Sequence, residues 1–168
     1  RLISGIVLVI LAIASILAGG SILLGVTAAI SIVGMFELYR VFQFEKTILA
    51  GVAYLAAILY YINLALHFVD DEMILILGML ILLMFVYVFS YPRYRAKQVM
   101  ASFFGVFYVA VMLSYIYQIR TLNNGMYLAF LIFICSWGCD TCAYCVGKLI
   151  GRHKMSPKLS PKKSVEGG

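Results

Sequence analysis

Asp140 is the one acid that lies deep inside an apolar segment of this sequence. Burying an ionisable group in hydrocarbon costs free energy unless a cavity or a partner compensates. Asp140 precedes Lys148 by eight residues, which is about 12 Å along a helix. We therefore take Asp140 as the first candidate for a catalytic residue, with a polar contact between helices as the alternative interpretation.

The segment that carries Asp140 has two different faces. At about 100° per residue, one face groups five residues within about 80°: Trp137, Asp140, Tyr144, Gly147 and Gly151. The glycine pair permits close backbone approach, so this face suits a helix that lines a site or packs on a neighbour. We expect Trp137 and Tyr144, together with Glu166 further along the chain, to support the site.

The chain has four cysteines, Cys135, Cys139, Cys142 and Cys145. Most of them lie on the other face of this segment. Their spacing permits a zinc site, an iron–sulfur cluster or a redox function. The alternative is that they are small buried apolar residues, because cysteine often has this role and cluster ligands normally come from loops.

A basic segment follows Ile150 and contains five Lys/Arg residues but a single acid, Glu166. Pro157 and Pro161 oppose a continuous helix. Cationic and hydroxyl donors lie close together just before Glu166, at Ser160, Lys162, Lys163 and Ser164. Such donors can bind a phosphate-rich substrate at the membrane surface. A basic segment beside a membrane can also do no more than fix topology and touch anionic headgroups.

The elements that position these residues are transmembrane helices. The sequence is 64% hydrophobic and 12% charged, with a mean hydropathy of +1.04, which excludes a soluble domain. About 17 to 25 apolar residues cross a bilayer, and the sequence divides into six such stretches: 2–18, 21–42, 47–66, 73–89, 99–117 and 125–150. We predict an all-α, polytopic transmembrane bundle of about six helices over residues 1–150, then a basic cytoplasmic loop over 151–168. The first and fourth stretches are short enough to be re-entrant instead.

The distribution of basic residues predicts the orientation. With the N-terminus inside, 12 of the 13 Lys/Arg residues face the cytoplasm and only Arg120 faces outward. Positive flanks resist translocation, so this asymmetry favours a multi-pass protein with its N-terminus and residue 168 in the cytoplasm. Asp70, Asp71 and Glu72 then lie in an outer loop.

The last third of the chain contains two specific motifs. Trp137, Asp140, Thr141, Ala143, Tyr144 and Gly147 form a Trp-x-x-Asp-Thr-x-Ala-Tyr-x-x-Gly pattern, and residues 160–167 read Ser-Pro-Lys-Lys-Ser-Val-Glu-Gly. Together, at this separation, they resemble bacterial phosphatidate cytidylyltransferase, also called CDP-diacylglycerol synthase. Residues 1–130 resemble that family only in hydropathy and number of segments.

The resemblance implies a nucleotidyltransferase of the bacterial cytoplasmic membrane that uses Mg²⁺. It implies transfer of a cytidylyl group from CTP to phosphatidic acid, giving CDP-diacylglycerol and pyrophosphate. Lys162 and Lys163 would contact phosphates with help from Ser160 and Ser164, and Asp140 would orient a lysine or a hydrated cation. The expected partners are these two substrates and membrane lipids. We expect no nucleic-acid partner and keep a homodimer as a candidate assembly.

The resemblance also implies a further signature with the main metal ligands downstream of Gly168. We therefore expect this chain to be the N-terminal part of the enzyme and to be inactive alone. The rival interpretation is a transporter or channel in which Asp140 binds a proton or cation, but transport gives no reason for the Ser-Pro-Lys-Lys-Ser motif. A CTP-dependent lipid kinase is a further alternative, which product identification would separate.

Overall fold

The computed structural model describes residues 2–156 and 160–167 and confirms the all-α class. The chain forms two compact units, Arg1–Leu122 and Asn123–Gly168, each of which is described by itself. In the first unit the helices are α1 (Leu2–Ala18), α2 (Gly20–Val41), α3 (Ile48–Leu66), α4 (Glu72–Phe89), α5 (Ala96–Phe104), the π-helical segment η1 (Gly105–Val111) and α6 (Met112–Thr121). The second unit contains α7 (Gly125–Leu149) and the strands β1 (Lys154–Ser156) and β2 (Ser160–Ser164).

Five helices are long and apolar enough to cross a membrane: α2, α3, α4, the continuous α5–η1–α6 helix and α7. The protein is therefore a multi-pass membrane protein. Helix α1 is apolar but shorter, so whether it crosses the membrane stays a prediction. The orientation of the chain also stays a prediction, and Arg1 and Gly168 lie outside the described residues.

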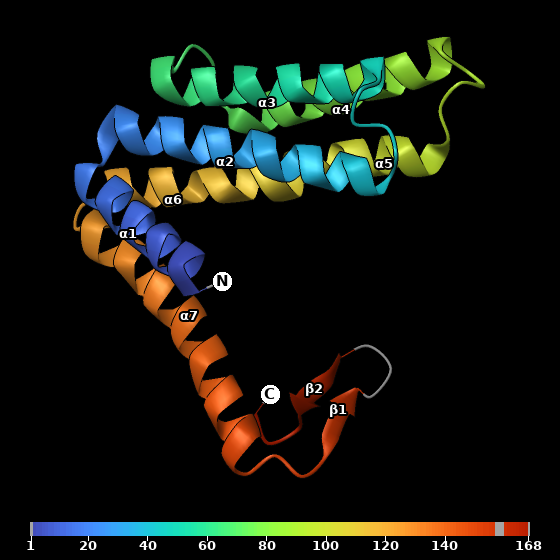
Figure 1. Cartoon of the computed structure of the whole chain (residues 1–168). Helices are drawn as coiled ribbons and strands as arrows, with labels where there is room; N and C mark the ends of the chain where they lie inside the picture. Colours follow the sequence, from blue (N-terminus) through green and yellow to red (C-terminus); the bar gives the residue numbers. More distant parts are fainter. Residues whose placement is uncertain (1, 157–159, 168) are drawn as a thin grey trace. The chain divides into compact units, whose positions relative to one another are not determined.

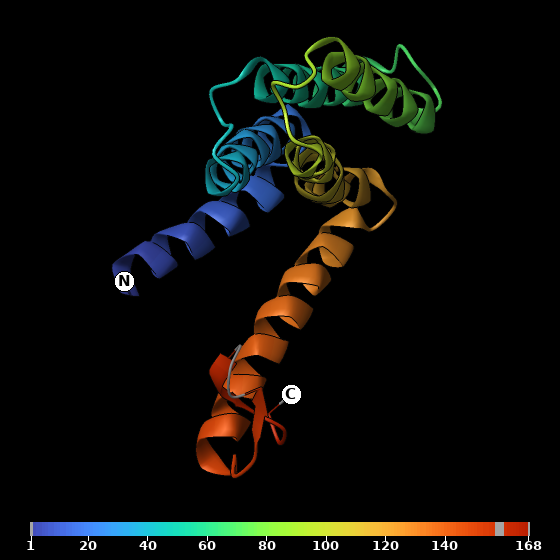
Figure 2. The same ribbon diagram turned by 90° about the vertical axis from the view of Figure 1, so that its right-hand side faces the viewer.

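The first unit is a bundle in which α2, α3, α4 and α5–η1–α6 run side by side (Figures 1 and 2). Helix α3 presents a face of small buried residues, Ala50, Ala53 and Ala57, at helical spacing. Small residues let helix backbones approach closely, which matters in a membrane because packing replaces the hydrophobic effect between helices. The bundle thus has its core around α3.

A tyrosine and a glycine lock α2 against the α5–η1–α6 helix. Tyr39 is fully buried, and its ring fills the space beside Gly105, where an added Cβ would lie 2.5 Å from Tyr39 Cε1. The Tyr39 hydroxyl donates a hydrogen bond of 2.8 Å to the carbonyl of Ser102. This contact lies where the helix changes from α to π geometry at Gly105. Any larger residue at position 105 would displace the ring.

A buried polar network joins α3, α4 and α6. The Tyr60 hydroxyl donates to Glu72 Oε2 at 2.8 Å and lies 3.1 Å from Ser114 Oγ. The amide nitrogen of Gln118 donates to the oxygens of Tyr60, Glu72 and Ser114 at 3.2 to 3.3 Å. Each polar group in the network therefore has a partner, as buried polar groups require.

Arg120 is the one basic residue that the charge distribution predicts on the outer side. Its side chain contacts the turn between α1 and α2. Its Nε donates to the carbonyl of Ile16 at 3.0 Å, and its guanidinium lies against Gly19. The last carbonyls of a helix have no partner within that helix, so Arg120 satisfies one of them in α1. Gly19 has a φ of 62°, which suits glycine at this turn.

In the second unit, α7 ends at Leu149 and the chain forms an antiparallel hairpin, with Lys154 opposite Ser164 and Ser156 opposite Ser160. The basic segment was predicted as a loop, so the hairpin is a correction. Polar and basic residues give little strand signal on their own. In the structure, β1 pairs with β2 and β2 also packs on α7, as the next subsection describes.

Candidate functional site

The hairpin lies against the last turns of α7 because two glycines leave room for it. An added Cβ on Gly147 would lie 3.0 Å from Ser164 Oγ, and one on Gly151 would lie 2.6 Å from the same atom. An added Cβ on Gly167 would lie 2.5 Å from the carbonyl oxygen of Ala143. The predicted close approach at the glycine pair is thus a contact with the chain's own β2 strand.

Ser164 is the buried residue of the predicted phosphate-binding set. Its side chain is 7% exposed, and its Oγ has no hydrogen-bond partner among the described residues. Buried hydroxyls usually have a partner, so an unpaired one needs an explanation such as a bound water, an ion or a functional role. Tyr54, Tyr94 and Ser102 in the first unit also have unpaired hydroxyls among the described residues. The structure therefore keeps one free hydroxyl at the contact between the hairpin and α7.

The other predicted phosphate contacts lie on the same strand. Lys163 is exposed beside Ser164, and Ser160 is partly exposed at the start of β2. The backbone of Lys162 belongs to β2, but its side chain lies outside what the structure describes. The hairpin therefore carries an exposed lysine and, at the next position, a buried hydroxyl that faces α7. Successive side chains of a strand point to opposite faces, so these are two separate donors to phosphate oxygens.

Glu166 fastens the end of the hairpin to its beginning. Its carboxylate accepts backbone hydrogen bonds of 3.2 Å from Arg152 and from His153, and His153 Nδ1 lies 2.7 Å from Glu166 Oε1. The backbone N–H of Val165 donates to the His153 carbonyl at 2.9 Å. Glu166 is thus a positioning residue that sets the shape of the hairpin.

These hydrogen bonds lower the pKa of Glu166 to about 2. The backbone N–H of Glu166 itself makes the largest contribution, the His153 side chain is next, and the N–H groups of His153 and Arg152 add to it. Donors that bind the charged form of a carboxyl group favour ionisation. Sequence reasoning did not identify His153, because the pairing spans 13 residues and depends on the chain reversal.

Asp140 lies on α7 and is exposed, as are Trp137 and Tyr144. No hydrogen bond or ion pair to Asp140 occurs within the described part of the chain. Asp140 precedes Ala143 by three residues, about 4.5 Å along the helix. Because Ala143 contacts Gly167, the hairpin reaches within one helical turn of Asp140.

The described residues do not provide a metal site. No group of three His, Cys, Asp or Glu side chains among them could hold a metal ion. Asp140 is a single carboxylate, and the four cysteines are free and exposed. The structure therefore gives the zinc, iron–sulfur and redox interpretations no support, and no step can be derived through Mg²⁺ from these residues alone.

Comparison with known proteins places this sequence in a family. A sequence model described as "Cytidylyltransferase family" matches residues 1–168. The chain belongs to the cytidylyltransferase family. This confirms at the family level the resemblance carried by the Asp140 and Ser160–Gly167 motifs.

Three similar members of the family are named phosphatidate cytidylyltransferase. The protein from Aquifex aeolicus is 35% identical over 104 residues, which are 62% of this chain and 38% of the relative. Those from Staphylococcus saprophyticus and Staphylococcus haemolyticus are 31% identical over 98 residues and 34% over 80, covering 58% and 48% of this chain. These two matches cover 37% and 30% of the relatives, so each match spans less than two fifths of a family member's length.

Proposed function

We propose that this chain supplies part of an enzyme that transfers the cytidylyl group of CTP to phosphatidic acid. The observation that carries the proposal is the hairpin, in which Lys163 is exposed, the buried hydroxyl of Ser164 has no partner among the described residues and Glu166 fixes the backbone. Family membership supports an enzyme of this class. The names of the relatives supply the proposed reaction.

In the proposed reaction, a phosphate oxygen of phosphatidic acid attacks the α-phosphorus of CTP. The bond between that phosphorus and the oxygen bridging to the β-phosphate breaks, and pyrophosphate leaves with the electron pair. Such a transfer depends mainly on positioning the reactants and neutralising negative charge. Lys162 and Lys163 would neutralise phosphate oxygens, and the hydroxyls of Ser160 and Ser164 would donate hydrogen bonds.

Asp140 is the candidate catalytic residue of the proposal. Its exposed and unpaired carboxylate, within one helical turn of the hairpin contact, would orient a lysine or a hydrated Mg²⁺ ion. The described residues offer no set of three ligands, so most of the ion's ligands would come from elsewhere. Mg²⁺ would supply charge neutralisation on the phosphates.

The proposed location is the cytoplasmic membrane of a bacterium, with the hairpin on the cytoplasmic side. The Lys/Arg asymmetry supports this orientation. It would give the hairpin access to CTP from the cytosol and to a lipid phosphate from the bilayer. A transporter that binds a cation at Asp140 is the alternative, but transport gives no reason for the Ser-Pro-Lys-Lys-Ser motif.

The test uses membranes that contain the intact protein, supplied with CTP, Mg²⁺ and phosphatidic acid. CDP-diacylglycerol and pyrophosphate are the expected products, whereas a lipid kinase would give a phosphorylated lipid and CDP. Lys163→Ala should lower the rate about 10- to 100-fold, the effect of losing one charge-assisted hydrogen bond. Lys46→Ala, an equally exposed lysine in the α2–α3 loop, is the matched control. Undiminished synthesis in both Lys163→Ala and Asp140→Asn would refute the assignment of these residues.

A further inference from the structure

An apolar groove with one charged residue lies on the helical bundle of the first unit. It is a cavity of about 620 Å³ lined by residues of α2, α4, α5 and η1. Its floor includes the buried side chains Leu83, Val99 and Ala101, and exposed residues such as Met100 and Phe104 line it as well. Lys97 is the charged residue of the lining.

The groove has the length of one bilayer leaflet. Its lining in the α5–η1 helix extends from Lys97 to Phe107, ten residues or about 15 Å. The hydrocarbon core of a bilayer is about 30 Å thick, so one leaflet contributes about 15 Å. Lys97 lies in the first turn of α5, beside the loop that carries Arg93 and Arg95. A molecule in the groove would therefore have its charged end at the basic membrane surface and its apolar part along the helices.

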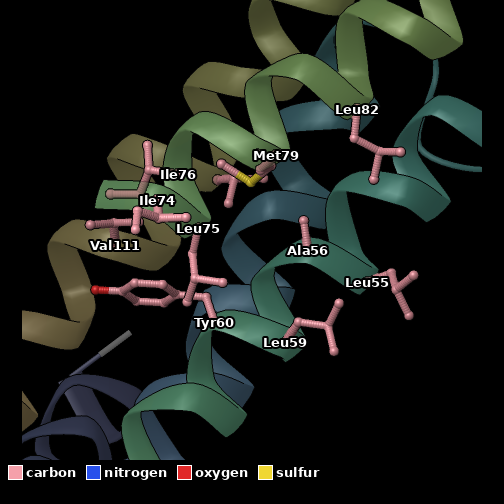
Figure 3. A pocket seen from close by; sticks show the side chains of 12 residues that line it. Leu55, Ala56, Leu59, Tyr60, Ile74, Leu75, Ile76, Met79, Leu82 and Val111 are labelled. Carbon is pink, nitrogen blue, oxygen red and sulfur yellow. The ribbon is translucent and has the colours of Figure 1, made fainter. Parts of the chain in front are cut away.

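Lys97 is available for an anionic partner. It is exposed, and it makes no ion pair with an acid of the described residues. Figure 3 shows the smaller cavity, of about 230 Å³, which is lined mainly by residues of α3 and α4. It differs in this respect, because the hydroxyl of its polar residue, Tyr60, already donates a hydrogen bond to Glu72. The larger groove thus has at one end a positive charge that is unpaired among the described residues, whereas the smaller cavity is apolar apart from Tyr60.

We propose that this groove binds one anionic glycerophospholipid, with the lipid phosphate on Lys97 and an acyl chain between α4 and α5. The attraction of a basic residue for an anionic headgroup at a membrane surface and the burial of an acyl chain in an apolar groove act together. This site goes beyond the proposed function, since it lies in the first unit and does not use the hairpin.

The experiment measures binding by the whole chain in a neutral detergent, with no turnover. Phosphatidylglycerol and phosphatidylcholine with the same acyl chains are titrated separately, and native mass spectrometry counts the bound lipids. Thermal unfolding provides a second readout, because a ligand of the folded state raises the unfolding temperature. Phosphatidylglycerol is not a substrate of the proposed reaction, so failure here would leave that reaction untouched.

We expect one phosphatidylglycerol to bind more tightly than phosphatidylcholine. Lys97→Gln should weaken phosphatidylglycerol binding about fivefold, the contribution of one basic residue at a membrane surface. Lys97→Arg should retain the affinity for phosphatidylglycerol, and Lys46→Gln should leave that affinity unchanged. Met100→Ser should weaken binding about threefold through lost apolar contact. Ile81→Ser is its control, because Ile81 and Met100 are 69% and 70% exposed but only Met100 lines the groove.

Four results would overturn the proposal. The first is equal affinity for the two lipids, which would mean an unselective lipid-facing surface. The second is an equal response to Lys97→Gln and Lys46→Gln, which would mean that Lys97 does not bind the lipid phosphate. The third is binding of glycerol 3-phosphate as tight as that of phosphatidylglycerol, which would mean that the groove does not hold the acyl chain. The fourth is conversion of a dimer to a monomer by Met100→Ser, which would show that a second copy covers the groove.

Discussion

Glycine makes room for a larger side chain in both units, but the side chains that fill the two spaces differ. In the bundle, the Tyr39 ring fills the space at Gly105 and its hydroxyl is satisfied by the carbonyl of Ser102. In the second unit, Ser164 fills the space at Gly147 and Gly151, and its hydroxyl has no partner within the described residues.

The two hydroxyls therefore differ in what they can still bind. The Tyr39 hydroxyl is already hydrogen-bonded, whereas the Ser164 hydroxyl can still bind a further partner. Tyr39 contributes packing area and one hydrogen bond, so its own hydroxyl needs no further partner, although the buried Ser102 Oγ at the same contact has none among the described residues. Ser164 contributes little area and keeps an unused donor at the face of β2 that packs on α7. An unsatisfied buried hydroxyl costs free energy, and a bound phosphate would be one way to recover it.

The largest expected effect is from Gly151→Ala. Its Cβ would clash with the backbone carbonyl oxygen of Gly147 and would lie 2.6 Å from Ser164 Oγ, so both the end of α7 and the hairpin should shift. We expect the cytidylyltransferase rate to fall about 100-fold, as misplacement of positioning groups by about 1 Å can do. Limited trypsin digestion should also cleave the basic hairpin faster. Gly138→Ala is the control, because an added Cβ there meets nothing within 4 Å. Equal rates in the two variants would mean that the packing of the hairpin on α7 is not needed for activity.

Gly105→Ala tests the corresponding contact in the bundle. The added Cβ would lie 2.5 Å from the buried Tyr39 ring, and overpacking of this kind costs about 1 to 3 kcal/mol. Unfolding in detergent, followed by circular dichroism, should show this loss of stability. Gly51→Ala in α3, with nothing within 4 Å, should instead be neutral or stabilising by up to about 1 kcal/mol. If Gly105→Ala behaved like Gly51→Ala, the tight contact at Tyr39 would be wrong.

Tyr60→Phe tests the buried network of α3, α4 and α6. Removing the hydroxyl deletes its bonds to Glu72 and Ser114 and should destabilise the bundle by about 1 to 2 kcal/mol. The same unfolding measurement applies. Tyr127→Phe, at a residue 71% exposed, should change stability by less than about 0.5 kcal/mol. Similar values for both variants would contradict a role for the network in stability.

The smallest effect concerns the pH dependence of the hairpin. The pKa of Glu166 is about 2 in the folded state and 4.5 without the hairpin contacts. Because the pKa is lowered in the folded state, the contribution of the Glu166 carboxylate to the stability of the hairpin is complete above about pH 4.5 and is lost as the pH falls toward 2. Amide hydrogen exchange at Arg152 and His153, corrected for intrinsic rates, should therefore be constant from pH 7 to 5 and accelerate below. Glu166→Gln should remove this step, and a step that persisted in the variant would assign it to another group.

The helical part of the fold could be predicted because long apolar stretches in a membrane have few alternatives to helix. The first stretch, 2–18, does form a helix, but at 17 residues it is too short to decide whether it crosses. The π-helical segment at Gly105 could not be predicted. It lies beside Tyr39, a contact between residues 66 positions apart.

The site could be predicted in part. The motif indicated Ser160, Lys163 and Ser164, and β2 does bring them onto one strand. The burial of Ser164 and the bond between Glu166 and His153 depend on how the hairpin seats on α7, which no local pattern encodes. Asp140 was selected because an acid in an apolar segment is costly, yet the structure leaves it exposed, so its partner stays a prediction.

The π-helical segment makes the α5–η1–α6 helix sensitive to its length in residues. Removing one residue from 105–111 would turn everything after it by about 100° relative to everything before it. Ser102 would keep its place beside Tyr39, whereas Ser114 and Gln118 would rotate away from Tyr60. A single-codon deletion here would therefore uncouple the two ends of one helix, a change that no substitution along the same segment could reproduce.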